Sequence, residues 1–148
     1  MNTDIKVQVE ALKTGGFRTA EHENIIMITQ GNYIVYIEKN NFFLNSEKMK
    51  RFEGECLSCH YPEEMEKHEY TAIETNKMLR MNNREIAVGI EVEDNHEMIW
   101  IKEKYLKLFK RCAISAYCVG GNNAGIIFRD GKMIKGFVLP VEIREGRK

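Results

Sequence analysis

Hydrophobic and polar residues alternate at the start of the chain. Ile5, Val7 and Val9 are separated by single polar or charged residues. This period of two is typical of a β-strand with one buried face, because successive side chains point to opposite sides of a sheet. We therefore predict a strand in this segment.

Two apolar runs follow in close succession. Residues 25–29 (IIMIT) and residues 33–38 (YIVYIE) flank the tripeptide QGN. Gly31 and Asn32 tolerate positive φ angles, which tight hairpin turns require. The pattern predicts a β-hairpin, and the NFFL segment at 41–44 is expected to extend the same sheet.

The periodic pattern stops between residues 46 and 69, where charged residues are dense. We expect an irregular charged loop there with short helical turns, one of them opened by Pro62 at its first position. Strand patterns return further on. In the run from Ile86 to Val92 the alternate apolar residues share one face. The predicted strands of this region are residues 70–75, 77–81, 86–92 and 98–101.

Residues 102–112 show the clearest helical pattern of the chain. Tyr105, Leu108, Phe109 and Cys112 fall at positions i, i+3, i+4 and i+7, so they form one apolar stripe on a helix. The sequence therefore predicts an amphipathic helix here.

Short strands separated by glycine-rich turns close the chain. The turn signals are the Gly120–Asn123 run and Asp130–Gly131. Nine or ten short strands against one clear helix predict an α+β fold that is β-rich, with a mainly antiparallel sheet. A length of 148 residues predicts a single domain.

Composition excludes some classes of protein. At 43% hydrophobic residues the chain can bury a core, and its 22 basic and 22 acidic residues cancel. No apolar run reaches the roughly 18–20 residues of a membrane span, and the first residues do not resemble a secretory signal. We expect a cytoplasmic protein with reduced cysteines and no structural disulfide.

The sequence CLSCH contains the strongest local motif. Its CxxCH pattern matches covalent haem attachment, which requires export, whereas a redox pair would need a helix start without acidic neighbours. Cys56 and Cys59 with His60 or His68 could instead bind a structural zinc ion. An ordinary loop without metal is the alternative, and Cys112 and Cys118 are expected to be small buried hydrophobic residues.

Motifs of common enzymes are absent from the sequence. It has no HExxH, no Walker loop, no GxGxxG, no GxSxG and no ordered zinc-deaminase signature. Paired carboxylates such as Glu63 and Glu64 lie in a polar run, where a solvated surface explains them. We therefore expect a protein that is not an enzyme.

One face of the predicted helix is basic. Besides Lys102 it carries Lys104, Lys107, Lys110 and Arg111, and only one acidic residue accompanies them. These cations either keep a solvent-exposed surface soluble or face the phosphates of a nucleic acid, where they would gain from counterion release. Periodicity does not distinguish the two interpretations.

The last third of the chain resembles a known family. The strand–helix junction IWIKEKYLKLF and the closing segment GFVLPVEI resemble the C-terminal domain of the bacterial sliding clamp, the β subunit of DNA polymerase III. The resemblance covers residues 84–143. A clamp protomer has three such domains and this chain has room for one. Glu142 stands where the family often has arginine, and residues 46–69 have no counterpart in it.

The resemblance implies a function without chemistry. Clamp helices face duplex DNA with basic residues, which would be Lys104, Lys107, Lys110 and Arg111 here. The closing strand of the family borders an apolar cleft for peptide motifs of replication proteins. By position, Leu139, Pro140 and Val141 would line that cleft. A one-domain chain could form a homo-oligomeric ring or act as an adaptor or decoy.

Three hypotheses follow from the sequence. The first is a clamp-like DNA-associated accessory factor of a phage or mobile element, which binds the DNA backbone or replication proteins. The second is a protein-interaction or inhibitor protein, whose exposed strand edges and charged 46–69 loop form the contact surface. The third is a small zinc-binding protein centred on Cys56 and Cys59.

Overall fold

The structure is a computed structural model, and it describes residues 2–52 and 57–142. Ten strands form one sheet in the order β4-β1-β2-β3-β10-β9-β8-β5-β6-β7. Every neighbouring pair is antiparallel except β1 and β4. The predicted β-rich α+β fold is thus confirmed. The strands are β1 (Arg18–His22), β2 (Ile25–Gln30), β3 (Tyr33–Glu38), β4 (Lys50–Arg51), β5 (Glu69–Arg80), β6 (Ile86–Val92), β7 (Met98–Lys102), β8 (Ala113–Val119), β9 (Asn122–Asp130) and β10 (Met133–Val138).

The helices are short. They are α1 (Thr3–Thr14), α2 (Pro62–Glu66), α3 (Glu103–Leu108) and the 3₁₀ turns η1 (Lys39–Asn41), η2 (Ser46–Lys48) and η3 (Leu57–His60). In the described part of the chain, none of them has the length and apolar character needed to cross a bilayer.

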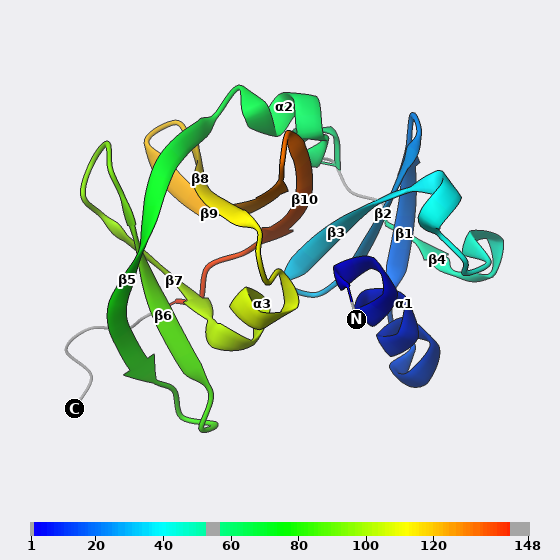
Figure 1. The fold of residues 1–148 in the computed structure, drawn as a ribbon, viewed down its shortest axis with the longest axis horizontal. Helices are drawn as coiled ribbons and strands as arrows, with labels where there is room; N and C mark the ends of the chain where they lie inside the picture. Colours follow the sequence, from blue (N-terminus) through cyan, green and yellow to red (C-terminus); the bar gives the residue numbers. More distant parts are fainter. Residues whose placement is uncertain (1, 53–56, 143–148) are drawn as a thin grey trace.

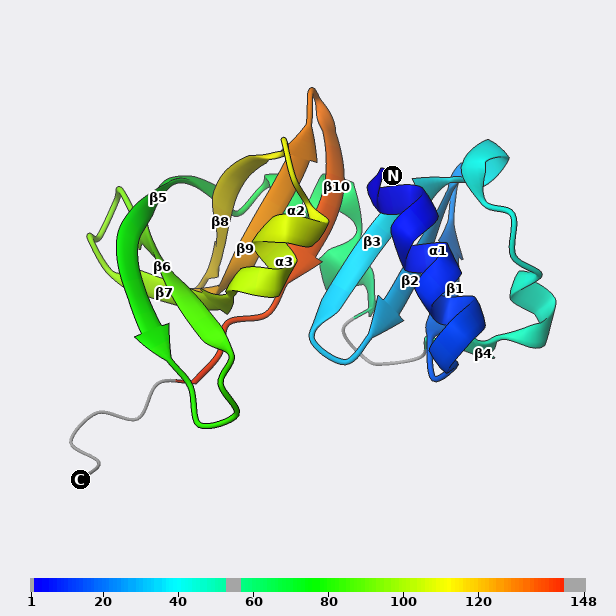
Figure 2. The same ribbon diagram turned by 60° about the horizontal axis from the view of Figure 1, so that its bottom comes forward.

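Two similar units meet at the middle of the sheet. The first αβββ unit consists of α1 and β1–β3, and the second αβββ unit consists of α3 and β8–β10. Their last strands pair antiparallel, with Val35 opposite Gly136, so the sheet order of the second unit mirrors that of the first. Both helices cover the same face (Figures 1 and 2). This repeat could not be recognised from the sequence, because the two units share an arrangement of elements and no exact run of residues.

The sheet has a hydrophobic core on each face. On the helix-bearing face, Val7 of α1 and Tyr105 and Phe109 of α3 pack with strand residues into one core cluster. On the opposite face, Met65 of α2 packs with Tyr36 and neighbouring strand residues into the other. Strands β2 and β3 lie between the two clusters, which explains why they are continuous apolar runs.

The predicted N-terminal strand is wrong, because this segment is helix α1. The Asn2 side chain caps the helix by accepting a hydrogen bond from the Ile5 backbone N–H at 3.0 Å. Gly15 ends it at a φ of 68°, which glycine adopts without steric cost. Val7 is buried, whereas Ile5 is 40% exposed, so the alternation did not mark a buried face.

The prediction that residues 41–44 extend the sheet is also wrong, and buried Gln8 explains why. Its side chain donates to the Asn41 carbonyl at 3.1 Å and accepts from the Phe43 N–H at 2.8 Å. These bonds hold residues 41–43 against α1, so the NFFL segment does not extend the sheet. Gln8, which the alternating pattern placed on the polar face of a strand, instead forms the hydrogen bonds that hold this loop.

Other segments differ from the prediction in extent. The predicted strands at 70–75 and 77–81 are one strand, β5, with an irregularity between Glu74 and Met78. The predicted helix at 102–112 shortens to α3, and residues 139–142 form no strand. Pro62 is the first residue of α2, as predicted. Strands β5–β7 curl toward the helix-bearing face, where β7 contacts β9.

Candidate nucleic-acid interface

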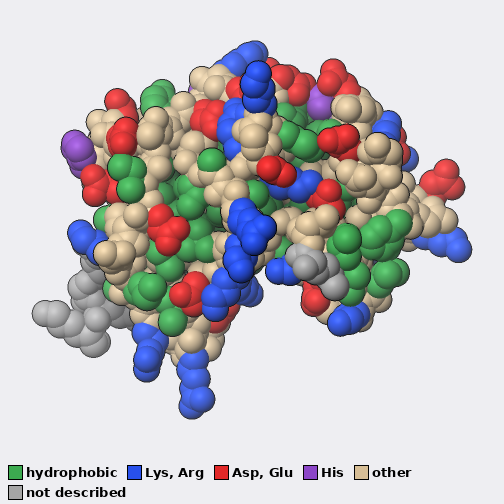
Figure 3. Space-filling view, in the orientation of Figure 1, with side chains coloured by type: hydrophobic (Ala, Val, Ile, Leu, Met, Phe, Trp, Pro, Cys, Tyr) green, Lys and Arg blue, Asp and Glu red, His purple; other side chains and the backbone are tan. Residues whose placement is uncertain are grey.

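A groove of about 540 Å³ lies between the start of α1 and the end of α3. It is therefore bordered by both αβββ units. Asn2, Thr3 and Lys6 line it from the first unit, and Lys110 and Arg111 line it from the turn that follows α3. Figure 3 shows Lys and Arg side chains in a column down the middle of this face, beside a hollow between the two halves.

Packing inside the second unit directs the turn after α3 outward. The Phe109 ring is 1% exposed and stacks on Phe128, with ring centres 4.5 Å apart. Gly136 lies directly beneath the Phe109 ring, and any Cβ at that position would collide with it. Arg111 adopts a φ of 72° and closes the turn. With Phe109 held in the core, Lys110 and Arg111 are exposed beside the groove.

A direct contact joins the two sides of the groove. The Thr3 hydroxyl donates a hydrogen bond of 2.8 Å to the Leu108 carbonyl at the end of α3. Lys135 of β10 forms an ion pair with Asp4 beneath the first turn of α1. The start of α1 and the end of α3 are thus held in place across the groove.

The groove carries an excess of positive charge. Its basic lining residues are Lys6, Lys110, Arg111 and Lys135, and its acidic ones are Asp4 and Asp130. Lys135 is already paired with Asp4. Within the described residues, no carboxylate lies within 4 Å of the other three cationic groups. These three exposed cations can accept an anion without breaking an ion pair.

The predicted basic residues separate into two sets. Lys110 and Arg111 lie at the groove. Lys104 lies 3.3 Å from Glu85, which also pairs with Lys102 at 3.2 Å.

The remaining predicted lysine is also paired. Lys107 lies 3.6 Å from Glu103, one helical turn away. The pKa of the Glu85 carboxyl is lowered, first by the hydrogen bond from Asn83 and then by the two lysines. Carboxylates therefore offset half of the predicted set.

Lys6 is a residue that sequence analysis missed. In a strand it would point away from the apolar stripe as an ordinary surface lysine. In the helix that actually forms, it faces the groove opposite Lys110 and Arg111. The Asn2 cap followed by Asp4 was the sequence signal for a helix at this position.

The predicted partner-binding residues follow β10 and run from the turn between β2 and β3 to strand β7. The Leu139 N–H donates to the Asn32 carbonyl and the Val141 N–H to the Trp100 carbonyl, both at 2.8 Å. Pro140 and Val141 border a cavity of about 400 Å³. Leu139 is 41% exposed but does not line that cavity.

The wall of this cavity is partly apolar, with Glu97 and Asn123 as its polar lining residues. Met98 and Trp100 line it from β7. Both side chains also lie against Gly89, where a Cβ would come within 2.9 Å of Met98 and 3.2 Å of Trp100. Pro140 and Val141 thus share the cavity with an indole and a thioether.

The predicted zinc ligands are not gathered together in the described part of the chain. Cys56 lies outside the described residues. The Cys59 carbonyl accepts a 3.0 Å hydrogen bond from Tyr117, and the His60 ring lies 5.2 Å from that of Phe137. His68 packs edge-on against Tyr117 at 6.1 Å. These three residues form no cluster of metal donors.

Burial raises the pKa of the two remaining thiols. Both Cys112 and Cys118 are half-buried and pack against the core, and desolvation is the main cause of each shift. The Cys118 thiol lies 3.0 Å from the Asn123 side-chain oxygen. They pack as small hydrophobic residues, as predicted, although neither is fully buried.

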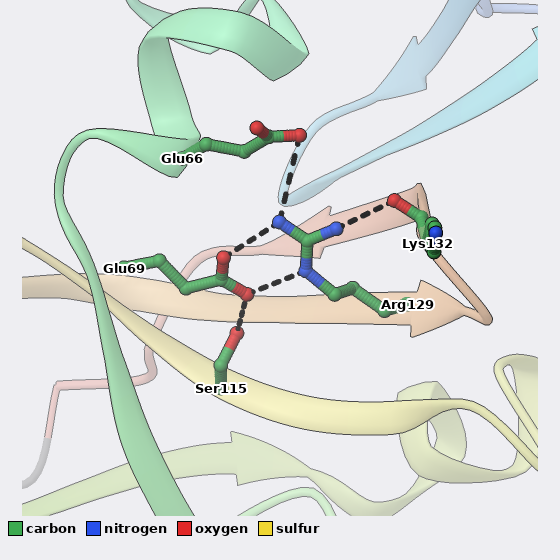
Figure 4. Close-up of polar contacts among 5 residues, drawn as sticks. All are labelled: Glu66, Glu69, Ser115, Arg129 and Lys132. Carbon is green, nitrogen blue, oxygen red and sulfur yellow. Dashed lines mark hydrogen bonds and ion pairs between the residues drawn. The ribbon is translucent and has the colours of Figure 1, made fainter.

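A charged cluster on the opposite face joins several elements of the fold (Figure 4). Arg129 donates two hydrogen bonds to Glu69, at 2.7 and 2.6 Å, and a third to the Lys132 carbonyl at 2.7 Å. Ser115 also donates to Glu69, and Glu66 lies 3.5 Å from Arg129. The guanidinium, first by its hydrogen bonds, lowers the pKa of Glu69. Because these groups satisfy one another, the cluster is structural.

Comparison with known proteins adds no assignment. No protein-family model, no curated protein and no solved structure matches the chain.

Proposed function

We propose that this protein is a non-enzymatic, clamp-like DNA-associated accessory factor that holds the backbone of duplex DNA on its helix-bearing face. One observation carries the proposal: Lys6, Lys110 and Arg111 approach one groove from both αβββ units, and no carboxylate in the described residues pairs with them. The placement of both helices on one face is also what the resemblance to the clamp family would require.

Phosphate is the ligand that such a groove suits. A backbone phosphate presents anionic oxygens at regular spacing, and cations that bind it release condensed counterions. The three groove cations are long, exposed side chains, and two of them are lysines, which act as point charges on phosphate. We therefore expect binding that depends on salt and not on base sequence.

The test replaces Lys110 and Arg111 by glutamine and follows binding to a short duplex at several salt concentrations. Each lost phosphate contact should reduce the slope of log K against log salt by about 0.9, so the K110Q/R111Q variant should lose nearly two. The matched control is K50Q/R51Q, an exposed Lys-Arg pair on β4 at the far end of the sheet. An equal loss in both variants would contradict the proposal.

Protein binding is a second candidate function, favoured by the cavity beside β7. Met98, Trp100, Pro140 and Val141 offer apolar contacts in this partly polar cavity, and we infer that they receive the apolar side chains of a peptide segment. The resemblance to the clamp family points to replication proteins as the source. Trp100 is the sole tryptophan of the chain, so its fluorescence should change when a peptide of the clamp-binding type is added. Unchanged emission at saturating peptide would exclude this cavity as the site.

Ring formation would require several copies of the chain. Solution mass with and without duplex DNA tests this directly. A larger assembly that forms on DNA supports a ring, whereas a monomer on DNA supports an adaptor.

A further inference from the structure

A group of metal-binding side chains lies on the side of the sheet away from the groove. His22 ends β1, Glu23 begins the turn to β2, and Glu63 is the second residue of α2. Their donor atoms lie within 4.8 Å of one another, and this is the only group of three potential ligands in the described residues. Segments 41 residues apart in sequence therefore converge on one point.

The surrounding structure holds the imidazole in place. The His22 ring stacks on Tyr61 with centres 3.7 Å apart and planes inclined by 12°. Its side chain is 17% exposed, and its Nε2 lies 2.5 Å from a Glu63 oxygen. The imidazole nitrogen and the carboxylate already point toward each other, as two ligands of one ion must.

Contacts with the core also hold helix α2 in place. Met65 is fully buried, and the Tyr36 hydroxyl donates to the His60 carbonyl at 2.6 Å just before the helix. Glu63 is therefore carried by a segment anchored on both sides. The site is preorganised and does not depend on a loop closing over it.

The local charge favours a cation. A cavity of about 300 Å³ adjoins the group, and Glu23, Glu38, Glu63 and Glu66 line it against Lys132. The bound ion would thus have protein donors on one side and open space on the other.

We propose that His22, Glu23 and Glu63 bind a divalent transition-metal ion, with Zn²⁺ as the best match. One imidazole and two carboxylates are common zinc donors, and imidazole disfavours Mg²⁺ and Ca²⁺. The ion takes the place of the proton shared by His22 and Glu63, and its fourth position faces the cavity. It joins the first αβββ unit to the segment that connects the two units, so binding stabilises the fold.

This site differs from the zinc site that the sequence predicted at Cys56 and Cys59. The proposed ligands include no sulfur. Co²⁺ in place of zinc therefore gives a spectrum without thiolate-to-cobalt charge transfer, whereas a cysteine site gives that band.

The experiment measures Zn²⁺ binding by equilibrium dialysis against a competing chelator. Wild-type protein should bind one ion. Glu23→Gly, Glu63→Gln and His22→Phe should each weaken binding at least about 100-fold, since even the partners of metal ligands contribute ~10–100-fold. His22→Phe keeps a ring to stack on Tyr61. Glu23 has a φ of 54°, so glycine there should preserve or improve the turn.

Two controls keep the result unambiguous. Glu47→Gln changes an exposed carboxylate that belongs neither to the ligand group nor to the cavity and should leave the affinity within about two-fold. The C56S/C59S variant removes the thiols and should bind zinc normally. Zinc should also raise the melting temperature of wild type and of C56S/C59S, but not of Glu23→Gly. Absence of binding in wild type, or binding that survives Glu23→Gly and Glu63→Gln, would overturn the proposal.

Discussion

The two αβββ units place a helix on the same face of the sheet but hold it by different means. Helix α1 has 12 residues and a cap at each end, yet its fully buried residues are only Val7 and Gln8. Helix α3 has six residues and no side-chain cap, yet Tyr105 and the adjoining Phe109 are deep in the core. Capping interactions at its ends stabilise α1, whereas packing against the sheet stabilises α3.

The largest expected effect concerns the second unit. Phe109→Ala removes a ring that stacks on Phe128 and fills the space above Gly136. We expect it to lower the free energy of unfolding by about 3–5 kcal/mol, as measured by urea denaturation. Val7→Ala, the matched change in the first unit, should cost about half as much because it removes fewer buried atoms. Equal losses of unfolding free energy in the two variants would show that core packing stabilises α1 as much as it stabilises α3.

The next effect concerns the first unit. Gln8→Met keeps the volume of the side chain but leaves the Asn41 carbonyl and the Phe43 N–H without their partner. Unsatisfied buried groups of this kind cost about 1–3 kcal/mol each when no water replaces the partner. Hydrogen exchange should increase at residues 41–43 before it increases in the strands. Unchanged exchange there would mean that α1 is held by Val7 alone.

The charged cluster predicts a dependence on pH. Arg129 lowers the pKa of Glu69 below its ordinary value of 4.5. A carboxyl with a lowered pKa in the folded state contributes stability that is complete above that ordinary value and is lost as the pH falls through the lowered one. Glu69→Gln should therefore lower the melting temperature at pH 7 and flatten its decline below pH 4.5. Parallel decline in both proteins would show that Glu69 contributes nothing to acid stability.

The smallest expected effect on stability comes from Glu85→Gln. Glu85 is a surface carboxylate that pairs with Lys102 and Lys104, and such pairs contribute little to folding. The melting temperature should stay nearly constant. Because the change releases the two lysines at the start of α3 from their carboxylate, DNA binding should tighten. A matched Glu91→Gln change, which affects only the contact with His96, should leave DNA binding unchanged.

The strands were predictable from sequence where local patterns agree with tertiary contacts. The hairpin at QGN, the turn at Asp130–Gly131 and the apolar face of Ile86–Val92 all formed as predicted. The N-terminal helix was not predicted, because Val7 and Gln8 are buried for different reasons and their neighbours imitate an alternating strand. The Asn2 cap and the burial of Val7 in the core together stabilise a helix despite that alternating pattern.

Only part of the candidate site could be predicted from the sequence. Lys110 and Arg111 follow from the helical stripe, since a buried Phe109 leaves the next two residues exposed. Lys6 required the correct secondary structure, and the pairing of Lys104 with Glu85 required the distance between two elements. The group of His22, Glu23 and Glu63 depends on a contact between residues 41 positions apart, which no local spacing in the sequence indicates.

The contribution of each of the three groove cations to DNA binding can be measured separately. Salt titrations of wild type, K6Q, K110Q/R111Q and the triple variant should give slopes that decrease by about 0.9 for each cation removed, with a combined loss near three. That result would place contacts from both units on one duplex. A triple variant that binds DNA with the wild-type slope would contradict the central claim.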